Sequence, residues 1–293
     1  MGGALISGIV VGGIYGLLAV GIVLIYKGAR IINFAQAEIG TFSLYVAYFV
    51  ISEDEGLGLP WAVGALAALL VGGAISLAFE RIVVRKMFGA ERLSVAVATI
   101  GLLLLLVAVE LRAWGSGPRF LQGPISGLGP KLLGVYVSPT QILALVASLV
   151  IGVGLTAFLQ RTDFGLGVLA AAEDPNAARL VGVPLARVSA FSWTIAGLLS
   201  VIAALFVEPT LGIFFPGVMT LLFVPALAAA LLGGLTSIGG AFVGGLIIGI
   251  VDQVVSYLFL GSQVPATQII AIFLVIMVVL LLRPQGVLSR RAA

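Results

Sequence analysis

The sequence predicts an all-α polytopic integral membrane protein with about 8–9 transmembrane helices. Of its 293 residues, 61% are hydrophobic and only 9% are charged, whereas an average soluble domain has about 25% charged residues. Its apolar runs approach the ~20 residues that a helix needs to cross the hydrocarbon core of a bilayer. These runs are apolar on all sides and do not alternate with polar residues, so they indicate a helical bundle.

Nine apolar segments are predicted to span the membrane. In chain order they are Ala4–Tyr26, Ile31–Ile51, Pro60–Phe79, Leu93–Leu111, Pro139–Leu159, Val188–Val207, Val218–Leu232, Ala241–Leu260 and Ala266–Leu282. The first begins at an uncharged N-terminus, which favours a transmembrane helix over a secretory signal. Residues 218–260 leave two alternatives open: two spans, or one span with a re-entrant piece. The total falls to seven if this region holds no complete span.

Basic residues predict the orientation, because cytoplasmic loops collect Lys and Arg. With the loop at 80–92 inside, twelve of the 15 basic residues fall inside: Lys27, Arg30, Arg81, Arg85, Lys86, Arg92, Arg161, Arg179, Arg187, Arg283, Arg290 and Arg291. The outside receives Arg112, Arg119 and Lys131, together with the acidic loop at 53–55. The N-terminus is therefore expected outside and the C-terminus inside.

Several classes of chemistry are excluded by residue types that the chain lacks. It has no Cys and no His, which excludes disulfides, thiolate or imidazole metal sites, and Ser-His-Asp or Cys-His catalysis. None of its three lysines lies in a phosphate-binding loop, so an ATP-driven process would need its ATPase on another polypeptide. We expect no catalytic residue, no cofactor and no bound nucleic acid.

Residues 1–293 are predicted to form one transmembrane domain with two longer loops. The outer loop, 112–138, is rich in Gly and Pro, with a short hairpin ending at Val135–Val137. It is either a plain connector or a contact surface for an extracytoplasmic protein.

The inner loop, 160–187, contains a predicted short helix. Asp174 is a good N-cap, Pro175 suits the first helical position, and Gly182 suits the left-handed conformation that ends a helix. Leu180 and Val181 would form an exposed apolar tip. The segment is either an interfacial linker or a docking element for a cytoplasmic partner.

Four segments resemble one known family. IINFAQAEIGTFSLYVAYF (31–49) resembles the second-helix signature of ABC-importer permeases for branched-chain amino acids. TDFGLGVLAAAEDPNAARLVGVPLARV (162–188) is similar to the cytoplasmic coupling loop of that family, without its full glycine spacing. GGLTSIGGAFVGGLIIGIVD (233–252) and LLLRPQGVL (280–288) resemble its last-helix motifs. Length and the lack of an extra N-terminal helix pair favour the smaller permease subunit.

The resemblance implies a type II-like ABC importer permease bundle in a bacterial or archaeal inner membrane. The implied partners are a second permease subunit in a heterodimer, two cytoplasmic ATP-binding subunits, an extracytoplasmic substrate-binding protein and the lipid bilayer. The implied cargo is branched-chain or related hydrophobic amino acids, moved by alternating access. The implied coupling residues are Asp174, Pro175, Asn176, Ala177, Ala178, Arg179, Leu180, Val181 and Gly182.

Asn33, Gln36 and Glu38 are polar residues within a predicted span. On an unbroken helix, Glu38 would lie about 12 Å from the inner edge and would point away from the other two residues. Either the helix is broken here, or the residues serve different neighbours. They could join helices, with Glu38 paired to a basic residue, or they could line or gate the inner half of a substrate path. Asp252 is a further candidate, as a helix-pair anchor or a pathway group.

Small residues recur every four positions at Gly8, Gly12 and Gly16, and again at Gly245 and Gly249. Such faces allow close helix packing, either within this chain or against the second permease.

Three other functions remain open from the sequence. One is a permease for urea or short amides in the same family. Another is an ion-driven secondary transporter, although no clear inverted repeat is present. The third is a structural membrane subunit without a path of its own.

Overall fold

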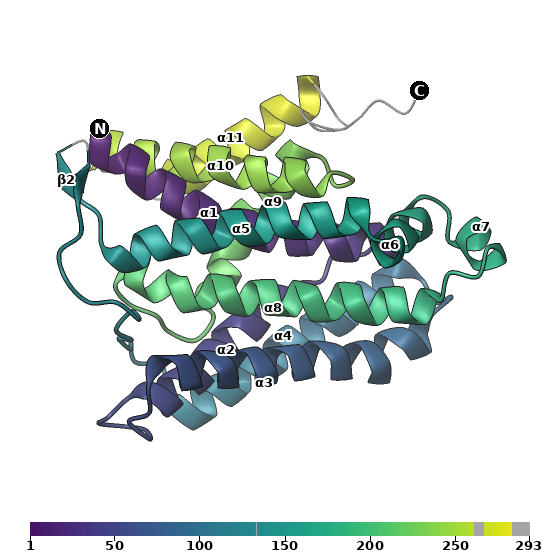
Figure 1. The fold of residues 1–293 in the computed structure, drawn as a ribbon, viewed down its shortest axis with the longest axis horizontal. Coiled ribbons are helices and arrows are strands. Elements are labelled where there is room, and N and C mark those ends of the chain that lie inside the picture. The colour runs from purple at the N-terminus through teal and green to yellow at the C-terminus, as the bar shows by residue number, and fades with distance from the viewer. Residues whose placement is uncertain (133, 261–266, 283–293) are drawn as a thin grey trace.

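The computed structural model describes residues 1–132, 134–260 and 267–282, which form a bundle of long helices lying side by side (Figure 1). The helices are α1 (Gly2–Ala29), α2 (Gln36–Ile51), α3 (Trp61–Ile82), α4 (Arg92–Trp114), α5 (Pro139–Arg161), α6 (Asp163–Glu173), α7 (Pro175–Leu180), α8 (Leu185–Leu211), α9 (Val218–Gly233), α10 (Ile238–Leu258) and α11 (Thr267–Leu282). A 3₁₀ turn, η1 (Val84–Met87), follows α3.

The two ends of the bundle differ in structure. The hairpin end carries the N-terminus and the antiparallel strands β1 (Lys131–Leu132) and β2 (Val135–Tyr136), which confirm the predicted hairpin. The opposite end, here called the α7 end, carries α6 and α7 (Figure 1). Of the Lys and Arg residues that the structure describes, all except Arg112, Arg119 and Lys131 lie at the α7 end. Arg283, Arg290 and Arg291 lie outside the described residues, as does Ala266, the predicted start of the last span.

The all-α membrane fold is confirmed. Among the described residues, six stretches are long and apolar enough to cross a bilayer: α1, α3 with η1, α4, α5, α8 and α10. α2, α9 and α11 are shorter, at 16 residues each. Large apolar side chains on α3, α4 and α5 are exposed, as expected for helices that face lipid.

The predicted span Ile31–Ile51 is wrong in its first five residues. Arg30 adopts the left-handed conformation (φ 54°) and ends α1, residues 31–35 are not helical, and α2 begins at Gln36. Gln36 Nε2 donates to the carbonyl of Leu18, 3.0 Å away, so α2 starts beside the middle of α1. The predicted helix that contains Asn33, Gln36 and Glu38 is therefore broken, which is one of the two alternatives given for this segment.

The region 218–260 forms two helices, of which α9 begins inside the bundle. Residues 212–217 are irregular and enter from the hairpin end, where the backbones of Phe214 and Arg119 pair. α9 then starts after Gly217 (φ 85°), and the N–H of Met219 donates to Thr41 Oγ1 at 3.3 Å. The start of α9 is thus at the depth of the second turn of α2.

α1 is the central helix of the bundle. It packs against α5, α8, α9 and α10, and 94% of its most apolar 18-residue stretch is buried. Gly8 and Gly12 pack on the backbone of α10 near residues 246–250, and Gly245 and Gly249 pack on the backbone of α1 in return. The predicted glycine faces therefore meet each other within this chain.

Gly245→Val should destabilise the protein. A Cβ at position 245 would meet the backbone of Gly16, so the two helices would have to separate, at a cost of about 1–3 kcal/mol. We expect a lower Tm for the purified protein in detergent. Gly154→Val is the matched control, because a Cβ there meets nothing within 4 Å. Equal melting temperatures for the two variants would contradict this account of the α1–α10 contact.

Candidate functional site

A group of buried polar side chains lies where α2 and α9 begin. Glu38, in the first turn of α2, is 0% exposed. Its Oε2 accepts a hydrogen bond from Thr220 Oγ1 of α9 at 2.5 Å and another from Thr41 Oγ1 at 3.3 Å. Because Gln36 bonds to Leu18 in the middle of α1, Glu38 lies near the middle of the bundle.

A second carboxyl group, that of Glu110 on α4, faces Glu38 and the backbone of Gly217. Glu110 is also 0% exposed. Both of its oxygens, together with Glu38 Oε1, have no hydrogen-bond partner among the described residues. We call Glu38, Glu110, Thr41 and Thr220 the polar centre.

Two adjacent buried carboxyl groups cannot both be ionised without a compensating positive charge. The two ion pairs formed within the described part of the chain, Arg85–Glu80 and Arg119–Glu55, do not involve the polar centre. The expected pairing of Glu38 with a basic residue is therefore absent from these pairs. The polar centre is suited to hold a proton or an organic cation.

Tyr45 adds a third polar group beside the two carboxyls. Its ring stacks on Trp114, with 5.0 Å between centroids, and its hydroxyl lies near Glu110. That hydroxyl is buried without a partner among the described side chains and backbone groups. The group is a hydrogen-bond donor and acceptor available to the polar centre.

Asn33 and Gln36 bind other neighbours. Asn33 Oδ1 accepts from the N–H of Ala35 at 3.0 Å, so it supports the non-helical turn before α2. Gln36 joins α2 to α1 through its bond to Leu18. The three polar residues of the segment therefore serve different neighbours, and only Glu38 belongs to the polar centre.

Asp252 of α10 lies apart from the polar centre. The hydroxyl of Tyr15 on α1 donates to Asp252 Oδ2 at 3.0 Å, and Gln253 Nε2 donates to the same oxygen at 3.3 Å. The structure thus places Asp252 at a contact between α1 and α10, which is the helix-pair alternative.

The sequence reasoning missed Glu110 and Thr220. Glu110 had a usable signal, because it is a lone acidic residue within the predicted span Leu93–Leu111. Thr220 had none, since a threonine in an apolar helix usually bonds the carbonyl four residues earlier.

At the α7 end, the short helix is capped as predicted. Asp174 Oδ1 accepts from the N–H groups of Asn176 and Ala177 at 2.8 and 3.1 Å. Gly182 adopts a φ of 86°, and the chain turns into α8 soon afterwards. Leu180 and Val181 are 88% and 78% exposed, so the apolar tip projects into solvent.

α6 was not predicted. Thr162 Oγ1 caps it by accepting from Gly165 N at 3.0 Å, and Arg30 Nη2 donates to the carbonyl of Ala172 at 3.3 Å. α6 therefore fixes the base of α7 to the end of α1.

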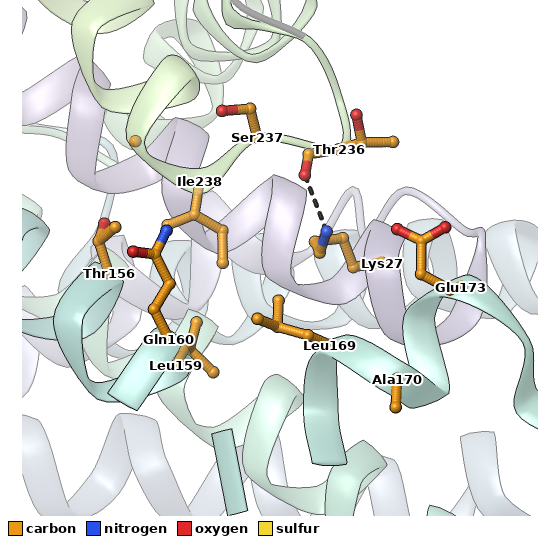
Figure 2. Close-up of a pocket in the computed structure, with 11 residues that line it drawn as sticks. Lys27, Thr156, Leu159, Gln160, Leu169, Ala170, Glu173, Thr236, Ser237 and Ile238 are labelled. Carbon is orange, nitrogen blue, oxygen red and sulfur yellow. Dashed lines mark hydrogen bonds between the residues drawn. The ribbon is translucent and has the colours of Figure 1, made fainter. Parts of the chain in front are cut away.

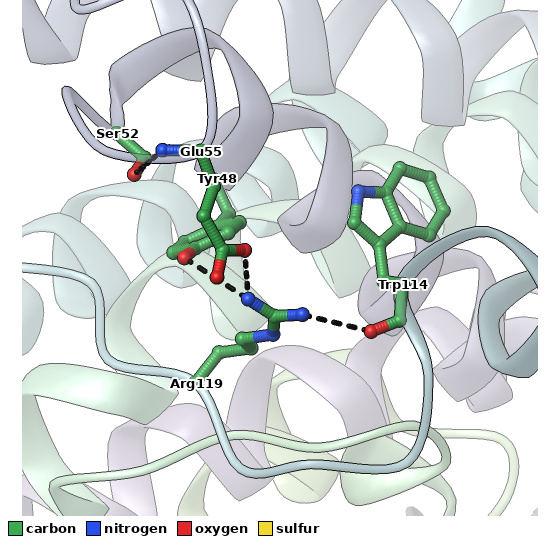
Figure 3. Close-up of polar contacts among 5 residues, drawn as sticks. All are labelled: Tyr48, Ser52, Glu55, Trp114 and Arg119. Atoms are coloured by element: carbon green, nitrogen blue, oxygen red, sulfur yellow. Dashed lines mark hydrogen bonds and ion pairs between the residues drawn. The ribbon is translucent and has the colours of Figure 1, made fainter.

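At the hairpin end, Arg119 fastens the long loop to the bundle (Figure 3). Its guanidinium pairs with Glu55 and donates to the carbonyl of Trp114 at 2.8 Å and to the hydroxyl of Tyr48 at 3.5 Å. The backbone of Arg119 also pairs with Phe214 in the irregular segment that leads to α9. The outer loop is thus connected directly to the entry of α9 into the polar centre.

Comparison with known proteins identifies the family. Residues 4–282 match the family described as branched-chain amino acid transport system, permease component. The high-affinity branched-chain amino acid transport system permease protein BraD of Pseudomonas aeruginosa is 32% identical, over 98% of this chain and 95% of that protein. LivH of Escherichia coli K12 is 27% identical, over 97% of this chain and 94% of LivH.

An archaeal relative matches the same family, and one solved structure has a similar fold. The probable branched-chain amino acid transport permease protein LivH of Methanocaldococcus jannaschii is 29% identical, over 92% of this chain and 87% of that protein. PsaBC from Streptococcus pneumoniae in complex with Fab has a chain with a similar fold, with a TM-score of 0.52, 16% identity and coverage of 96% and 91%. BraD and the two LivH proteins are transport permease proteins and not enzymes, in agreement with the sequence prediction. This chain therefore belongs to the family of permease components of branched-chain amino acid transport systems.

Proposed function

We propose that this chain is one of two permease subunits of an ATP-binding-cassette importer that moves branched-chain or related hydrophobic amino acids across the cytoplasmic membrane. The observation that carries this proposal is the polar centre, where two helices begin inside an apolar bundle that matches the permease family from residue 4 to residue 282. The proposed assembly adds a second permease, two cytoplasmic ATP-binding subunits and an extracytoplasmic substrate-binding protein.

The proposed orientation puts the α7 end in the cytoplasm and the hairpin end outside. The concentration of basic residues at the α7 end supports it. The N-terminus is then outside, and the outer loop 112–138, fastened through Arg119, faces the substrate-binding protein.

The polar centre is the proposed point at which the path recognises an amino acid. An α-ammonium group would be the positively charged partner that the buried carboxyl groups of Glu38 and Glu110 do not have among the described ion pairs. Phe34 and Phe223, with ring centroids 5.8 Å apart, supply apolar surface at the starts of the same helices. Asn33, Gln36 and Asp252 stay predicted pathway residues, and each has a packing contact in this structure.

The segment Asp174–Gly182 is the proposed coupling element. Its exposed apolar tip is suited to a groove on an ATP-binding subunit. Because α6 ties its base to the end of α1, a movement of α7 would reach the central helix. Closure of the ATP-binding subunits would in this way reorient the bundle around the polar centre.

A proton-driven transporter is the second candidate, since paired buried carboxyl groups also occur in proton relays. Reconstitution of the complete importer in proteoliposomes separates the two. We expect leucine uptake that requires ATP and persists when the proton gradient is dissipated. Uptake that continues without ATP and collapses with the gradient would refute the ATP-driven proposal. Preference for urea or short amides over leucine would refute the proposed substrate class.

Leu180→Asp should weaken attachment of the ATP-binding subunits. A charge at the apolar tip would have to be desolvated in the groove, so we expect at least a tenfold loss of co-purifying ATPase. Leu128→Asp is the matched control, because Leu128 is also 88% exposed but lies in the outer loop. Equal recovery of ATPase with both variants would argue against α7 as the coupling element.

Glu110→Gln and Glu38→Gln should each reduce ATP-driven leucine uptake at least tenfold, because each removes one of the two negative groups proposed to face the ammonium. Membrane insertion and recovery of the ATPase should be unchanged. Glu53→Gln, which alters an exposed carboxyl at the hairpin end, serves as control. Wild-type uptake in both test variants would remove the polar centre from the path.

A further inference from the structure

A cavity of about 490 Å³ opens at the α7 end, between the ends of α1 and α5, helix α6 and the first turn of α10 (Figure 2). Its volume falls within the roughly 300–1,000 Å³ typical of small-molecule sites. It is separate from the polar centre, since none of its lining residues belongs to that group. In the proposed orientation this cavity faces the cytoplasm.

One side of the cavity is suited to bind a carboxylate. Lys27 Nζ donates one hydrogen bond, to the carbonyl of Thr236 at 2.8 Å, and an ammonium group has two further donors. The first turn of α10 also borders the cavity. Ser237 Oγ caps the N–H of Gly240 at 3.1 Å, which leaves the N–H groups of residues 238 and 239 for another acceptor. An anion here would meet both a lysine and a helix N-terminus.

Next to Lys27, the carboxylate of Glu173 borders the same cavity (Figure 2). Glu173 is exposed and belongs to neither ion pair formed by the described residues. Leu159, Leu169 and Ile238 provide apolar surface at the other side of the lysine. A cation, an anion and an aliphatic wall thus surround one small volume.

This combination complements a zwitterionic amino acid with an aliphatic side chain. The α-carboxylate would meet Lys27 and α10, the α-ammonium would meet Glu173, and the side chain would lie against the leucines and Ile238. A free phosphate or an anionic lipid headgroup fits less well, because neither has a positive group to pair with Glu173.

We propose that this cavity binds the imported amino acid on the cytoplasmic side and slows further import. The inference rests on the proposed function for the identity of the ligand. Glu173 is the last residue of α6 and directly precedes Asp174, the N-cap of α7. A ligand held between Glu173 and α10 would tie the coupling segment to the bundle and favour one conformation over the other.

Direct binding tests the site without transport. Equilibrium dialysis of radiolabelled L-leucine against the solubilised importer, without the substrate-binding protein, should show saturable binding. Glu173→Gln and Lys27→Met should each weaken it at least tenfold. Glu91→Gln and Lys86→Met, which alter charges at the same end but outside the cavity, should not. 4-Methylpentanoate and leucinamide, which each lack one charge of leucine, should compete poorly.

Transport tests the regulation. Proteoliposomes filled with leucine should import it several-fold more slowly than empty ones, and the ratio of the two rates should approach one in Glu173→Gln. Absence of leucine binding by the wild type, equal binding by the cavity and control variants, or displacement of leucine by phosphatidylethanolamine would overturn the inference. Binding that persists although empty liposomes import no leucine would instead overturn the proposed function alone.

Discussion

The backbone of a membrane protein must satisfy its own hydrogen bonds inside the bilayer, because lipid provides no partners. Here side chains meet part of that requirement near the two helix starts inside the bundle. Asn33 Oδ1 accepts from the N–H of residue 35, Thr99 Oγ1 from that of residue 34, and Thr41 Oγ1 from that of residue 219. Polar residues that look misplaced in an apolar sequence therefore make the two breaks possible.

The breaks in turn explain how two carboxyl groups can lie at the middle of the bundle. The N-terminus of a helix carries a partial positive charge. Glu38 lies in the first turn of α2, and Glu110 faces the residue that precedes α9. The partial positive charges at the two helix starts offset part of the free-energy cost of burying the two acids. They do not neutralise both carboxyl groups, so one more positive group can bind there. A path that recognises an ammonium group would use that capacity.

Much of the architecture could be predicted from short-range rules. The glycines of α1 recur with the period that brings them to one face, and the same holds for Gly245 and Gly249. The two small-residue faces were therefore predictable, but their contact with each other was not. Asp174, Pro175 and Gly182 predicted α7 because caps act on adjacent residues. α6 was not predicted, although its cap, Thr162, also acts on a residue only three positions away. The identities of the partners came from family resemblance alone.

By itself, the sequence determined three properties. The chain is an apolar helical bundle, its Lys and Arg residues are concentrated at one end of that bundle, and the short capped helix lies between the fifth and sixth predicted spans. These properties depend on composition and on neighbours a few positions apart. Only the tertiary structure decided that α2 begins at Gln36, that Asp252 contacts Tyr15, and that Glu38 meets Glu110. Those contacts join residues far apart in the chain, and the packing of α1, α4, α9 and α10 determines which of them form.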